Sequence, residues 1–86
     1  MKIYVLEKEF FRLQDQTYSK ITEIVDADLD LERLIKASEP IRVQNKMFID
    51  NNYLTESIVK HFASPGGNIT LRIKQFTKEE IVESND

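Results

Sequence analysis

The chain has 86 residues, of which 41% are hydrophobic and 31% charged, and its 12 basic and 15 acidic residues give a net charge of −3. This balance indicates one folded domain spanning residues 1–86, and with only two glycines and two prolines it excludes disordered, collagen-like and low-complexity chains. The absence of cysteine excludes disulfides, thiolate zinc sites and a cysteine nucleophile.

The sequence also bears on where the protein acts. It has no run of the roughly 18 apolar residues that a membrane-spanning helix requires. The apolar run at residues 3–6 is too short for the core of a signal peptide. Because small secreted domains usually depend on disulfides, we expect a cytoplasmic protein that contacts no membrane.

The first 25 residues allow two interpretations. Phe10, Leu13 and Ile21 recur at helical spacing, which favours a strand followed by a long helix. β-branched residues and tyrosine are frequent after residue 16, however, and the polar residues 14–16 suit a loop. We favour a hairpin in which 2–12 pairs with 17–26, and the strand with a long helix is the alternative.

A helix is predicted at residues 29–38. Leu31, Leu34 and Ile35 lie on one helical face, with acidic residues at its start and a lysine in its last turn, as the helix dipole favours. Pro40 is expected to end this helix, because proline lacks an amide hydrogen and disfavours helical geometry at the preceding residue.

A short strand at 41–44 and a second helix at 53–63 are predicted next. The apolar stripe of that helix consists of Leu54, Ile58, His61 and Phe62. The helix must end before the turn at residues 64–68, where Pro65 and Gly66 suit the central positions of a type II turn.

Residues 69–75 are predicted to form a strand, because Ile69, Leu71 and Ile73 alternate with polar residues. Thr77 and Glu80 then have the spacing of a capping box, and Phe76 and Ile81 can form a hydrophobic staple around it. We expect a third, short helix to begin at this capping box. The sum is an α+β fold, in which a small antiparallel sheet of the N-terminal hairpin and strand 69–75 accompanies two or three helices.

Two groups of residues invite a chemical interpretation. Asp26, Asp28 and Asp30 have the opening spacing of an EF-hand calcium loop, but the glycine and glutamate that this loop needs are replaced by leucine and alanine. His61 has no sequence pattern that places a nucleophile or further metal ligands beside it. We therefore assign no catalytic, cofactor-binding or metal-binding residue, and we expect no enzyme activity.

Nucleic-acid binding is the alternative function. Helix 53–63, the following turn and strand 69–75 have the order of a winged helix-turn-helix. The basic residues that this interpretation would use are Arg42, Lys46, Lys60, Arg72 and Lys74. Because acidic residues are interleaved with them, this function is less favoured than protein binding.

The residues from Lys2 to Leu6, the hairpin after them and residues 30–35 together resemble small α+β proteins of bacteriophages and prophages. The resemblance implies a protein that binds and blocks host or defence machinery without catalysis, such as an enzyme that handles nucleic acids. It implies no particular functional residue.

We therefore predict an inhibitor-like protein-interaction module, with a second copy of the chain as a further candidate partner. The predicted polar part of the partner-binding surface is an acidic stretch of four residues, Asp26, Asp28, Asp30 and Glu32. Such a stretch would speed encounter with a basic surface. Phe48 and Tyr53 are the predicted apolar anchors, because they flank a polar turn.

Overall fold

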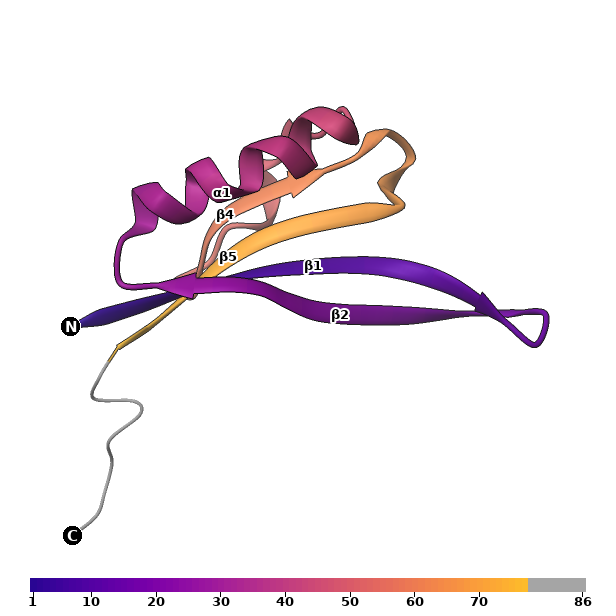
Figure 1. Ribbon diagram of the computed structural model, residues 1–86, viewed down its shortest axis with the longest axis horizontal. Coiled ribbons are helices and arrows are strands. Elements are labelled where there is room, and N and C mark those ends of the chain that lie inside the picture. The colour runs from indigo at the N-terminus through magenta and orange to yellow at the C-terminus, as the bar shows by residue number, and fades with distance from the viewer. Residues whose placement is uncertain (78–86) are drawn as a thin grey trace, which may run out of the picture.

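The computed structural model describes residues 1–77, which form a five-stranded antiparallel sheet with one α-helix on one side of it (Figure 1). In chain order, the elements are β1 (Lys2–Gln14), β2 (Thr17–Asp28), α1 (Leu31–Gln44), β3 (Phe48–Ile49), the 3-10 turn η1 (Asn51–Tyr53), β4 (Ile58–Ala63), the 3-10 turn η2 (Pro65–Gly67) and β5 (Ile69–Thr77). The order of the strands across the sheet is β2-β1-β5-β4-β3. None of the helices in this part of the chain has the length and apolarity needed to cross a bilayer.

The predicted N-terminal hairpin is confirmed, and the alternative of a long helix after the first strand is wrong. β1 and β2 pair antiparallel up to Gln14 and Thr17, with Asp15 and Gln16 as the two turn residues. Both turn residues have positive φ, 50° and 67°, which is the conformation of a type I′ turn and matches the twist of the strands. The Thr17 hydroxyl donates a hydrogen bond to the Gln14 carbonyl at 2.8 Å.

The hairpin extends beyond the rest of the sheet. β1 pairs with β5 only as far as Phe10, which lies opposite Ile69, whereas its pairing with β2 continues to the turn. Residues 11–20 therefore form a two-stranded arm that projects past the other strands (Figure 1). Phe11, Leu13 and Tyr18 are exposed on this arm.

The helix α1 is longer than predicted. It begins after Asp30, whose carboxylate accepts a hydrogen bond from the Glu32 amide at 3.0 Å. Pro40 lies inside the helix, so the prediction that it ends the helix is wrong, as is the strand predicted at 41–44. The Arg42 guanidinium donates to the Ile35 carbonyl at 3.2 Å, which adds a side-chain hydrogen bond to the helix near Pro40.

The core lies between α1 and the sheet. Its buried apolar members come from one face of the central strands and from the helix: Leu6, Phe62, Leu71, Ile73 and Leu34. The predicted strand 69–75 is confirmed as β5, and its alternating residues Leu71 and Ile73 both face this core. Burial of these side chains is the main force that holds α1 on the sheet.

The helix predicted at 53–63 is wrong, because this segment contains the end of η1 and the strand β4. The fold is α+β, as predicted, but the described residues contain one α-helix instead of two or three. The winged-helix alternative thereby loses its recognition helix.

The type II turn is confirmed: Gly66 has φ 87° and ψ −10°, and the Gly67 amide donates to the Ser64 carbonyl at 2.9 Å. The predicted third helix lies outside the described residues. Of its capping box, the structure describes only Thr77, which is the last residue of β5.

Candidate functional site

The two faces of the sheet differ. Leu6 and Ile73 point toward α1, so the residues that alternate with them point to the opposite side. In β1 these are Glu7 and Glu9, and the cross-strand partner of Glu7 in β5 is Arg72. Within residues 1–77 no α-helix lies on this side, which we call the uncovered face.

A network of ion pairs crosses the middle of the uncovered face. Arg72 lies 3.4 Å from a carboxylate oxygen of Glu7 and 3.1 Å from one of Glu9. Lys74 lies 3.3 Å from Glu7, and Lys20 lies 3.8 Å from Glu9. The side chains of Glu7 and Arg72 are only 14% and 16% exposed, so these charges stabilise one another in a partly dehydrated setting. The network thus joins β2, β1 and β5 by alternating charges.

A pocket of about 410 Å³ opens beside this network. Its position follows from a row of cross-strand neighbours, in which Ala63 and Thr70 lie between Phe48 on one side and Glu9 on the other. The small side chains of Ala63 and Thr70 leave a hollow between their larger neighbours. The other residues that shape the pocket include Asp50, Tyr53, His61, Ser64, Gly66, Gly67 and Arg72.

His61 forms part of the wall of this pocket. Tyr53 stacks on its ring, with the centroids 4.6 Å apart and the planes inclined by 25°. His61 is only 7% exposed, and its Nδ1 atom is buried without a hydrogen-bond partner. Burial lowers the pKa of His61, and the neighbouring positive charge of Arg72 lowers it further. The carboxylates of Asp50 and Glu9 raise this pKa in part, and the net lowering favours the neutral imidazole.

The pocket brings together few groups that could act in catalysis. The Ser64 hydroxyl accepts a hydrogen bond from the Ile69 amide at 3.0 Å, and the buried Nδ1 atom of His61 has no hydrogen-bond partner among residues 1–77. Across residues 1–77, no three histidine or acidic side chains are grouped so that they could hold a metal ion. The arrangement offers aromatic rings and charged side chains, which are groups suited to binding.

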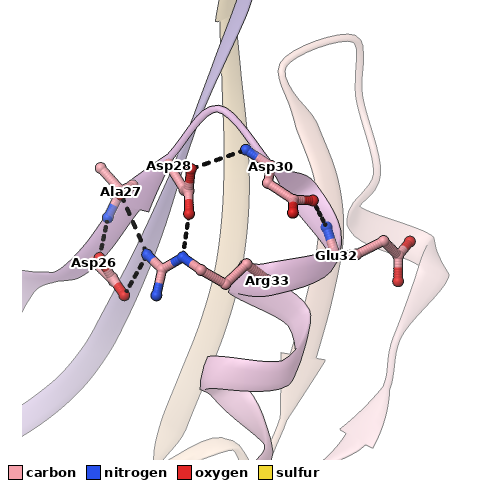
Figure 2. A network of polar contacts seen from close by, with 6 residues as sticks. All are labelled: Asp26, Ala27, Asp28, Asp30, Glu32 and Arg33. Carbon is pink, nitrogen blue, oxygen red and sulfur yellow. Dashed lines mark hydrogen bonds and ion pairs between the residues drawn. The ribbon is translucent and has the colours of Figure 1, made fainter.

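The predicted acidic stretch lies at the junction of β2 and α1 (Figure 2). Asp26 and Asp28 both form ion pairs with Arg33, at 2.9 Å for the Asp26 pair. Asp28 also accepts a hydrogen bond from the Asp30 amide, and Asp30 caps α1 through the Glu32 amide. The hydrogen bond from Arg33 lowers the pKa of the Asp28 carboxyl, and the same bond raises the pKa of Arg33. Three of the four acids thus hold the junction together, and the Glu32 side chain points away from it.

The structure does not bring the acidic stretch together with Phe48 and Tyr53. The stretch begins in β2, at one edge of the sheet, whereas Phe48 lies in β3 at the opposite edge and Tyr53 lies in η1 beside it. Phe48 and Tyr53 are 52% and 59% exposed, and both line the pocket.

The basic residues proposed for nucleic-acid binding are also divided between the two faces. Arg42 lies on the α1 side, 4.8 Å from the centre of the Phe62 ring. Arg72 and Lys74 lie on the uncovered face, where Glu7 pairs with both. These three cations therefore form no common patch for a phosphate backbone.

Sequence reasoning missed Glu9 and Thr70 as site residues, and it considered Arg72 only for nucleic-acid binding. One signal for them was available: Glu7 and Glu9 alternate in one predicted strand, as Arg72 and Lys74 do in another. Opposite charges in this pattern favour pairing of the two strands.

Comparisons of the chain with protein-family models, curated proteins and solved structures found no match.

Proposed function

We propose that this protein is a non-catalytic binding module that docks on a protein partner through the uncovered face and blocks that partner. The observation that carries the proposal is the pocket on this face, which has two half-exposed aromatic side chains, Phe48 and Tyr53, in its lining. Protein interfaces are enriched in aromatic residues that act as anchors near a recess, surrounded by polar groups. The ion-pair network beside the pocket would supply such a polar surrounding.

The arm extends the same face and adds apolar surface. Phe11 follows Glu9 by two residues in β1 and so lies on its side of the sheet, and the cross-strand neighbours Leu13 and Tyr18 continue this row. All three side chains are exposed. Exposed apolar side chains gathered in this way mark interaction sites, which supports a contribution of the arm to docking.

The proposed partner has a basic surface, as the nucleic-acid channel of a host or defence enzyme has. The chain carries a net charge of −3. At the β2–α1 junction, the four negative charges of the acidic stretch outnumber the single positive charge of Arg33, which pairs with two of them. Such a field would accelerate encounter with a basic surface, whereas the apolar and aromatic groups would determine how long the complex lasts.

The experiment that tests the proposal compares two variants of the tagged chain in cells of its native host. Phe48→Ala with Tyr53→Ala removes the anchors, and Val43→Ala is the matched control, because Val43 is 70% exposed on α1. We expect the double variant to lose at least about tenfold in affinity for the retained partner, as loss of an anchor does, and the control to bind like the wild type. Equal binding by the double variant would contradict the proposal, provided that thermal unfolding shows all proteins to be folded. Failure of the wild-type chain to retain any protein above background would contradict it too.

A further inference from the structure

We infer that the pocket on the uncovered face takes an arginine side chain of the partner protein. This inference rests on the proposed function and specifies the chemistry of the group that enters the pocket. Three properties of the pocket support it: the aromatic lining, the distribution of charge, and the position of one carboxylate.

The aromatic lining suits a flat cation. Tyr53 uses one side of its ring for the stack on His61 and remains 59% exposed, and Phe48 is exposed to a similar extent on the neighbouring edge strand. A guanidinium group stacks on such rings through cation–π attraction and has a weaker hydration shell than an ammonium group. The stack on His61 holds Tyr53 in place before binding, which reduces the entropy that association costs.

The charges in the lining favour a cation over an anion. Glu9 and Asp50 contribute two carboxylates, and Arg72 contributes one guanidinium. Arg72 is already paired with Glu7 and Glu9, so its charge is satisfied within the sheet. Burial and Arg72 lower the pKa of His61 more than Asp50 and Glu9 raise it, which favours the uncharged imidazole. The lining therefore carries one excess negative charge.

Asp50 supplies that charge. One of its oxygens accepts the Asn52 amide at 3.2 Å at the start of η1, and its carboxylate forms no ion pair with any residue that the structure describes. A guanidinium between Tyr53 and Asp50 would combine ring stacking with a charge-assisted hydrogen bond. An apolar side chain in the same place would dehydrate the carboxylate without pairing it.

The test is an NMR titration of the full chain with Nα-acetyl-arginine amide, followed at the amides of Ala63 and Thr70. We expect saturable shifts at both amides, with a dissociation constant in the millimolar range. The neutral isostere Nα-acetyl-citrulline amide should cause no saturable shift, and the lysine analogue should bind more weakly than the arginine one. Equal binding of the citrulline or lysine analogue, or absence of saturable shifts at these amides, would overturn the inference.

A pair of variants locates the charge that matters. Asp50→Asn should weaken binding of the arginine probe by about two- to fivefold, the contribution of a partly exposed ion pair. Asp15→Asn, at the tip of the arm, removes the same charge far from the pocket and should leave the affinity unchanged. Equal effects of the two variants would overturn the inference. Because the titration contains no partner, it can fail while the anchors are still required for partner binding, and it can succeed when no partner is retained.

Discussion

Tyr53 lies on the ring of His61, with the two centroids 4.6 Å apart, and this stack fixes η1 against the uncovered face of the sheet. His61 is in turn the cross-strand neighbour of Arg72, which Glu7 and Glu9 hold in place. An exposed tyrosine is thereby connected, through a buried histidine, to the charged centre of the sheet. The aromatic part of the pocket is thus held in place by the fold.

The buried imidazole should make stability depend on pH. Because the pKa of His61 is lowered in the folded protein, the unfolded chain binds a proton more readily than the folded one. The contribution of neutral His61 to the free energy of unfolding is fully present above about pH 6.5, the ordinary pKa of histidine. It is lost as the pH falls through that value toward the lowered pKa of the folded state.

The variant His61→Phe tests this prediction, because it keeps a ring for Tyr53 to stack on and removes the titrating group. We expect the melting temperature of the wild type to fall more than that of the variant between pH 7.5 and 5.5, and equal falls would contradict the assignment.

The core between α1 and the sheet should be sensitive to truncation at Leu71. This side chain is fully buried and packs with Leu34 and Phe62 in the core cluster. Leu71→Ala should lower the free energy of unfolding by about 2–4 kcal/mol, because it leaves a cavity. Leu13→Ala, on the exposed arm, is the control and should cost less than about 0.5 kcal/mol. Urea unfolding that gave similar losses for the two variants would argue against this core.

The start of α1 depends on Asp30. Asp30→Ala removes the side-chain acceptor for the Glu32 amide and should lower the free energy of unfolding by about 1 kcal/mol. Asp30→Ser keeps an acceptor at the cap and should retain most of that stability. If serine and alanine were equally destabilising in urea unfolding, capping would not be the role of this residue.

Steering by the acidic stretch can be separated from its structural role. Glu32 is the acid of the stretch that points away from Arg33, so Glu32→Gln removes charge without breaking the junction (Figure 2). Stopped-flow measurement at low salt should give a rate of association with the partner that is about twofold lower for Glu32→Gln and unchanged for Glu56→Gln. Glu56 is the matched exposed glutamate, outside the β2–α1 junction. Equal rates for Glu32→Gln and the wild type would contradict steering by the acidic stretch.

Local patterns predicted the hairpin, β5 and the type II turn because each is determined by neighbouring residues. β4 could not be identified in the same way, since its apolar residues have helical spacing and a register shift between Ile58 and Lys60 breaks the strand alternation. Beyond Pro40, Arg42 adds support to α1, because it donates to the Ile35 carbonyl and lies over the Phe62 ring. Phe62 comes from another element, so a single segment of sequence contains no sign of this support.

The candidate site was only partly accessible from the sequence. The polar turn that Phe48 and Tyr53 flank predicts both as anchors, and the structure places both at the pocket. The acidic stretch is internally paired at the opposite edge of the sheet. The pocket itself depends on the register that sets Ala63 and Thr70 between larger side chains, and this register is a property of four strands together.

The central claim is that a protein partner docks on the uncovered face. Its most direct test is site-specific photo-crosslinking in native host cells, with benzoylphenylalanine in place of Phe48 at the pocket or of Val43 on α1. Both positions are well exposed, so they differ mainly in the face that they report. We expect the probe at position 48 to form a covalent adduct with the partner that the wild-type chain retains, and the probe at position 43 to form none. An adduct from position 43 with none from position 48, or no adduct from either, would contradict the claim.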